Sequence, residues 1–175
     1  DVLQNLLKID FGQGSSSPLQ QGWESFASSA DNSALVEHNY STELASSGIL
    51  TIGVQGQSHW RDYRSISNGP YASLSALLSD EVLCNNSGTI TLSLSGLGPG
   101  TYRMKTYHHA SEGHGNTSYN LKTTDANGVD LMRFSGIQSS GGSTPESLST
   151  RTFLLIADQN STNLSIKVGP RSNNS

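Results

Sequence analysis

The stretch that decides the fold is residues 89–108, which reads TITLSLS (Thr89–Ser95), GLGPG (Gly96–Gly100) and TYRMKTYH (Thr101–His108). Apolar and polar side chains alternate in its first and third parts, which is the period of a strand with one buried face. Glycine and proline dominate the five residues between these parts, and they favour a tight reversal of the chain. The stretch therefore predicts two β-strands joined by a turn.

Short runs of the same kind lie on both sides of this stretch. Each is bounded by turn residues, as the strands of an antiparallel sandwich are. The runs are Leu6–Phe11, Gly48–Val54, Ser118–Thr123, Leu131–Phe134, Thr152–Ala157 and Leu164–Val168. The spacing of the leucines within Tyr71–Cys84 predicts one short amphipathic helix. We therefore expect an all-β fold, an antiparallel β-sandwich of the jelly-roll type with about eight strands and one short helix.

Composition narrows the classes of function. The 175 residues suit a single domain over residues 1–175, and a net charge of −4 provides no basic stripe for nucleic acid. No apolar run is long enough to span a bilayer, so we expect no membrane insertion. Charged residues make up only 14% of a chain rich in serine and glycine, which is typical of extracellular β-proteins. Since the chain starts at Asp1 without a signal peptide, we interpret it as a module excised from a larger secreted protein.

Four motifs in order resemble one known family. They are Ile9–Gly12 (IDFG), Gln20–Trp23 (QQGW), Trp60–Arg64 (WRDYR) and Leu94–Tyr102 (LSGLGPGTY), the last running on into Tyr107-His108-His109. Together they resemble the galactose-binding-domain-like jelly-roll carbohydrate-binding modules of bacterial extracellular proteins. The resemblance implies a module that binds polysaccharide without catalysis and is tethered to a polysaccharide-degrading enzyme. It also implies that one structural calcium ion is the candidate cofactor, and that binding itself requires none.

The first cluster suited to sugar recognition is rich in aromatic and charged side chains. An aromatic ring packs on the C–H face of a sugar, while Arg and Asp read the hydroxyl groups. An acidic or sulfated sugar would add charge-assisted pairs with the arginines. The candidate ligand-binding residues here are Trp60, Arg61, Asp62, Arg64 and Tyr71. The alternative is structural, with Trp60 buried and Arg61 paired with Asp62 on the surface.

The second cluster is Tyr107-His108-His109, at the end of the predicted strand, followed by Glu112 and His114 in the glycine-rich loop. Its candidate ligand-binding residues are His108, His109 and His114. Loops at strand ends commonly carry binding residues. Neutral histidines could bond to sugar hydroxyls, bind a transition metal, or serve as ordinary loop residues. Adjacent strand residues point to opposite faces, so at most one of His108 and His109 need face a given site.

Calcium and catalysis are separate questions. Asp125, Asn127 and Asp130 are weak candidate calcium ligands, and a plain hairpin turn is the alternative interpretation of the same residues. The sequence contains no nucleophile elbow, zinc-protease motif or phosphate-binding loop, so we expect no enzyme. Trp23 is predicted to plug one end of the sandwich, and the alternative is that it displays its ring to a ligand. The sequence thus predicts a secreted, non-catalytic carbohydrate-binding module, and the alternative is a structural or adhesive module of a surface layer or filament.

Overall fold

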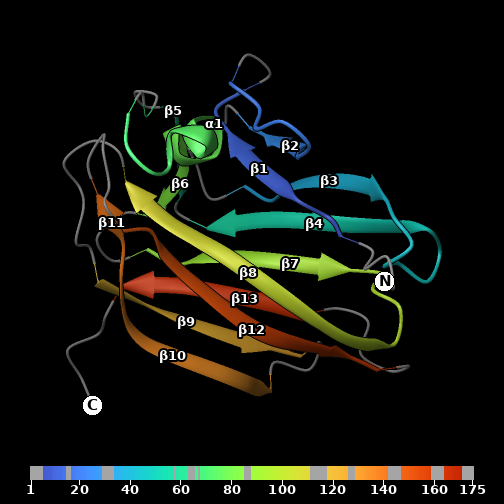
Figure 1. The fold of residues 1–175 in the computed structure, drawn as a ribbon. Helices are drawn as coiled ribbons and strands as arrows, with labels where there is room; N and C mark the ends of the chain where they lie inside the picture. The colour runs from blue at the N-terminus through green and yellow to red at the C-terminus, as the bar shows by residue number, and fades with distance from the viewer. Residues whose placement is uncertain are drawn as a thin grey trace.

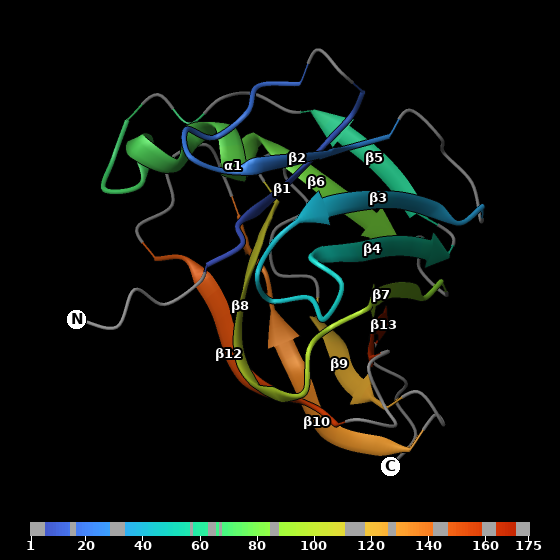
Figure 2. The same cartoon turned by 90° about the vertical axis from the view of Figure 1, so that its right-hand side faces the viewer.

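The structure is a computed structural model that describes residues 6–14, 17–28, 34–56, 58–62, 66, 68–84, 88–110, 118–125, 129–141, 147–158 and 164–170. Within them the chain forms a sandwich of two β-layers, seen face on in Figure 1 and edge on in Figure 2. The first layer is a six-stranded sheet in which every neighbouring pair is antiparallel. Its strands, in pairing order, are β10 (Asp130–Gln138), β9 (Ser118–Thr124), β13 (Leu164–Pro170), β7 (Ile90–Ser95), β4 (Ile49–Gly56) and β3 (Val36–Ser41).

The second layer is built around one long antiparallel pair, β8 (Gly100–Ala110) and β12 (Ser149–Ala157). The short strand β11 (Ser140–Gly141) adds to β8 in parallel. Smaller elements lie together on the β3 side of the sandwich, away from β10 (Figures 1 and 2). They are the parallel pair β1 (Ile9–Gly12) and β2 (Glu24–Ala27), the antiparallel pair β5 (Ser58–Asp62) and β6 (Asp80–Cys84), the 3-10 turn η1 (Ala72–Leu74) and the helix α1 (Ser75–Ser79).

The hydrophobic core lies between the two layers. Alternate residues of each strand point inward, so short runs with period two are enough to build it. The six-stranded sheet contributes Leu50, Ile52 and Val54 of β4, Leu121 of β9, and Leu164 and Ile166 of β13, and β12 contributes Phe153, Leu155 and Ala157. Burying each large apolar side chain stabilises the fold by about 1.5–3 kcal/mol. The predicted all-β sandwich with one short helix is confirmed.

The reversal at Gly96–Gly100 occurs where the sequence predicts it, but it does not form a hairpin. β7 belongs to the six-stranded sheet and β8 to the other layer, so the turn carries the chain from one layer to the next. Gly96 begins it with φ 91°, a conformation that other residues rarely adopt. The Tyr102 hydroxyl then closes the corner, lying 2.5 Å from the Gly98 carbonyl oxygen and 3.2 Å from that of Leu44.

The expected helix over Tyr71–Cys84 is too long. α1 ends at Ser79, and Asp80–Cys84 forms β6, which pairs with β5 in antiparallel register. Val82 lies opposite Trp60 in that register and packs against the core. Strand pairing with a distant segment therefore outweighs the helical spacing of the leucines, since local propensity is a weak preference that tertiary contacts override.

Candidate functional site

Trp60, the centre of the first predicted cluster, is a core residue. It is 1% exposed, and its ring stacks on Phe26 with 5.6 Å between centroids and 2° between planes. Phe11 lies 6.2 Å from Trp60 and 5.2 Å from Phe26, so the three rings join β1, β2 and β5. The Trp60 ring therefore has no open face for a sugar, and its burial agrees with the Trp60 part of the structural alternative.

The remaining residues of the first cluster are placed only in part. The backbones of Arg61 and Asp62 lie in β5, opposite Glu81 and Asp80, while their side chains lie outside the described part of the chain. Arg64 lies outside the described residues altogether. Tyr71 is partly buried and comes directly before η1. Of this cluster, the structure therefore places the side chains of Trp60 and Tyr71 only.

The second predicted cluster lies at the C-terminal end of β8, where alternate side chains meet different surroundings. His108 points between the layers, and its Nε2 lies 2.8 Å from the Thr106 hydroxyl. Its ring packs at 5.1 Å from that of Tyr119 on β9. Burial, together with the smaller effect of the nearby charge of Arg151, lowers the pKa of His108 from 6.5 to about 4. His108 is therefore neutral at pH 7 and belongs to the inside of the sandwich.

The Ser140 hydroxyl links the end of β8, beside His108, to β12 through hydrogen bonds. Ser140 on β11 donates its hydroxyl proton to the His108 carbonyl oxygen at 3.2 Å, and it accepts the Ser149 N–H at 3.3 Å. The Nδ1 of His109 lies 3.0 Å from the same hydroxyl oxygen. These contacts join β8, β11 and β12, so His109 has a structural role here. His114 lies outside the described residues.

The outward side of the same layer carries an aromatic pair. We call the outward positions of β8 and β12 the outer face; it points towards the viewer in Figure 1. Its members are Thr101, Arg103, Lys105 and Tyr107 of β8, and Thr150, Thr152, Leu154 and Ile156 of β12, with Trp23 packed beside Tyr107. The rings of Trp23 and Tyr107 meet edge to face with 5.9 Å between centroids, and both side chains are partly exposed. The outer face thus presents aromatic surface to solvent.

Trp23 is held in place by a short turn and a buried carboxylate. The Trp23 N–H donates to the Gln20 carbonyl at 3.0 Å, and Gly22 between them has φ 77°, as the third position of a type II turn requires. Asp10, 2% exposed, accepts the backbone N–H of Gln20 at 2.7 Å. The Gln20 side chain donates to the Ser73 carbonyl of η1 at 3.0 Å. The loop therefore presents Trp23 from a fixed position beside β8.

The Lys105 side chain lies over the ring of Tyr107. Its ammonium nitrogen lies 4.9 Å from the centroid of the Tyr107 ring, within the range of a cation–π interaction. The sequence places Tyr107 in the second cluster but does not indicate it as a ligand-binding residue. It does not single out Lys105, and it favours a plug over a displayed ring for Trp23. The alternation of β8 was the available signal, because an inward His108 requires outward neighbours. Nothing in the sequence indicates that Trp23 reaches Tyr107.

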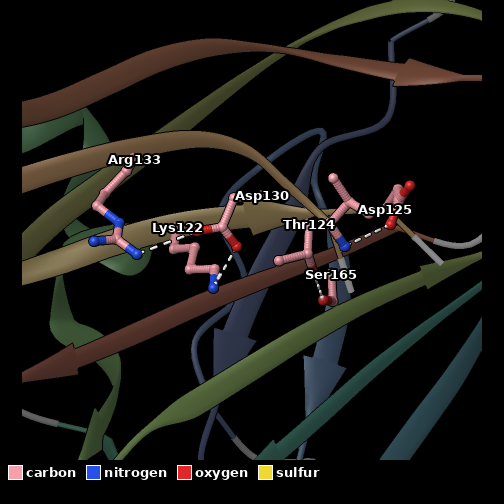
Figure 3. A network of polar contacts seen from close by, with 7 residues as sticks. Lys122, Thr124, Asp125, Asp130, Arg133 and Ser165 are labelled. Carbon is pink, nitrogen blue, oxygen red and sulfur yellow. Dashed lines mark hydrogen bonds and ion pairs between the residues drawn. The ribbon is translucent and has the colours of Figure 1, made fainter. Parts of the chain in front are cut away.

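Two of the three weak calcium candidates, Asp125 and Asp130, are engaged in a backbone hydrogen bond and in ion pairs (Figure 3). Asp125 Oδ1 accepts the Val129 N–H at 2.8 Å, which closes the turn between β9 and β10. Asp130 binds both Lys122 and Arg133, and the hydrogen bond from Lys122 is the main reason that its pKa is lowered. Asn127 lies outside the described residues. Across the described ranges, no three His, Cys, Asp or Glu side chains gather as metal ligands would.

Comparison of the chain with protein-family models, with curated proteins and with solved structures finds no match. No helix in the described part of the chain is long and apolar enough to cross a bilayer. The fold and the side chains of the outer face therefore carry the functional argument.

Proposed function

We propose that the chain is a non-catalytic carbohydrate-binding module that recognises an extracellular polysaccharide on the outer face. The observation that carries this proposal is the pair of partly exposed rings of Trp23, in the turn before β2, and Tyr107, on β8, which meet edge to face. Aromatic surface of this kind packs against the apolar C–H face of a sugar ring. The polar neighbours Thr150 and Thr152 supply hydroxyl groups for the sugar's own hydroxyls.

The module would act outside the cell, tethered to a polysaccharide-degrading enzyme. By holding the polymer close, it raises the effective concentration of substrate for the attached enzyme without doing chemistry itself. Binding on the outer face requires no cofactor, and a calcium ion would have a structural role only. The low charge and the rigid β-framework suit such a display surface.

The test is binding to a panel of polysaccharides by affinity gel electrophoresis and a glycan array. Trp23→Ala and Tyr107→Ala should each weaken binding about tenfold or more, because truncating an aromatic anchor commonly costs over ~1.4 kcal/mol. Tyr107→Phe keeps the ring and should retain most of the affinity. Unchanged binding by both alanine variants would remove the outer face as the site, and failure to bind any polysaccharide would overturn the function.

A second candidate function, a structural or adhesive surface module, is favoured by one observation. Leu154 and Ile156 are 51% and 60% exposed on β12, which pairs only with β8 among the described strands. An edge strand with exposed apolar side chains can pair with another copy. Sedimentation over a concentration series separates the candidates, since a glycan-binding module stays monomeric while a filament subunit forms ordered oligomers.

A further inference from the structure

We propose that the polysaccharide bound on the outer face is acidic, and that Arg103 and Lys105 bind its carboxylate or sulfate groups. This inference rests on the function proposed above and adds the class of ligand. It follows from the distribution of charge over the two layers and from the geometry of β8.

Charge is strongly segregated in the layer formed by β8 and β12. The whole chain has more acidic than basic residues, 14 against 10. Yet β8 and β12 contain three cationic side chains, Arg103, Lys105 and Arg151, and no Asp or Glu. A local excess of positive charge on a negative protein concentrates anions at that surface. The strands of this layer therefore carry a net positive charge, whereas the whole chain carries a net negative charge.

Among the residues that the structure describes, the two outward cations have no carboxylate partner. In the other layer, Lys122 and Arg133 both bind Asp130. Among the described residues, neither Arg103 nor Lys105 lies within ion-pair distance of a carboxylate. Both side chains are exposed, so binding an anion breaks no existing ion pair and removes little water from the protein. An acidic ligand would thus gain electrostatic attraction to both cations at a small desolvation cost.

The register of β8 places the cations in line with the aromatic pair. Positions 103, 105 and 107 all point outward, and each step of two residues advances about 6.6 Å along the strand. Across the strand, Arg103 lies opposite Leu154 and Lys105 opposite Thr152, both uncharged. The planar fork of an arginine matches carboxylate or sulfate geometry, and the lysine adds a point charge. A sugar against Trp23 and Tyr107 would therefore place its neighbours along the chain over the two cations.

The experiment uses matched polymers that differ only in charge. Polygalacturonate is compared with its carboxyl-reduced form, and a sulfated galactan with its desulfated form, by isothermal titration calorimetry at several salt concentrations. At least one acidic polymer should bind about tenfold or more tightly than its neutral counterpart at low salt, and this advantage should shrink as salt screens the charges. The two pairs distinguish carboxylate from sulfate as the preferred group.

Variants connect the preference to the two cations. Arg103→Gln and Lys105→Gln should each lose much of the tighter binding of the acidic polymer. Lys105→Arg keeps the positive charge and should retain the tighter binding. The matched control is Lys167→Gln, which makes the same charge change at an exposed position on β13 in the other layer. Lys167→Gln should bind like the unmodified protein. Circular dichroism confirms that each variant is folded.

The failures of the two proposals are distinguishable. Equal binding of charged and neutral polymers, lost in Trp23→Ala, would overturn the acidic ligand and leave the carbohydrate-binding function standing. Equal effects of Lys105→Gln and Lys167→Gln would also overturn the role of the outer face in charge selection. Binding to vesicles of anionic phospholipid, with no polysaccharide bound at all, would overturn both proposals.

Discussion

At the scale of single residues, neighbouring side chains on β8 point to opposite faces of the strand and have different roles. Tyr107 lies on the outer face beside Trp23, while His108 lies between the layers beside Thr106 and Tyr119. The inward position suppresses the charge of the imidazole, because burial and Arg151 both disfavour the protonated form. His108, which the sequence predicts as a ligand-binding residue, thus affects the stability of the fold.

His108 should make stability depend on pH in the mildly acidic range. Its pKa is about 4 in the folded chain and about 6.5 when unfolded, so between these values only the unfolded chain binds the proton. The free energy of unfolding should therefore fall as pH drops from about 6.5 to about 4, by at most ~3 kcal/mol, and this contribution should be constant outside that window. The measurement is urea unfolding at pH values from 7.5 to 4.

His108→Gln is the reference for that measurement, because glutamine keeps hydrogen-bonding capacity but does not titrate. The carboxylates and the other histidines contribute equally to both proteins, so the difference between the two pH profiles isolates His108. Parallel profiles would show that the imidazole is not suppressed.

At the scale of elements, one corner connects the two layers. Tyr102 on β8 lies against the Gly98 and Leu44 carbonyl oxygens, and the Gly98 N–H donates to Leu44 at 2.9 Å. The loop after β3 is thus fixed to the reversal between β7 and β8.

Removing the Tyr102 hydroxyl should loosen this corner. Tyr102→Phe leaves the Gly98 carbonyl without its partner and should lower the free energy of unfolding by about 1–2 kcal/mol. Tyr119→Phe is the matched control, because the Tyr119 hydroxyl is buried and has no hydrogen-bond partner among the described residues. That change should be neutral or stabilising. Thermal unfolding of the two variants checks the contrast, and equal losses would contradict it.

The elements also show what sequence can and cannot predict. Alternation is a local signal, so Thr89–Ser95 and Leu164–Val168 appear as β7 and β13 with nearly the expected bounds. β6 was missed because its apolar residues continue a helical spacing, and only β5 across from it decides the matter. The contact between Trp23 and Tyr107 is the same kind of case, since it joins segments far apart in the chain. Signals that depend on a distant partner are not contained in a local pattern.

At the scale of the whole molecule, the two layers share one interior and expose unlike outer surfaces. Ile166 of β13 is 2% exposed at the centre of the core, whereas Ile156 of β12 is 60% exposed on the outer face. An isoleucine is therefore a core residue in one layer and a solvent-exposed residue in the other. Stability should accordingly be far more sensitive to change on β13 than on the outer face.

Ile166→Ala should lower the free energy of unfolding by about 2–5 kcal/mol, because it removes buried methyl groups and leaves a cavity. Ile156→Ala should change it by about 0.5 kcal/mol or less, since the side chain is already largely in water. Urea unfolding of both variants measures the difference. A comparable loss in the two would mean that Ile156 is covered in solution, as a self-associating chain would require.

The position of β13 has a consequence for how the molecule is made. It follows every other strand in the sequence, yet it lies in the middle of the six-stranded sheet, between β7 and β9. Until it inserts, β3, β4 and β7 form one fragment of the sheet, β9 and β10 form another, and each has an open edge. Sheet assembly therefore waits for residues 164–170 to leave the ribosome. With most contacts between distant segments, folding should take milliseconds to seconds, and a chaperone that covers open edges would act in that interval.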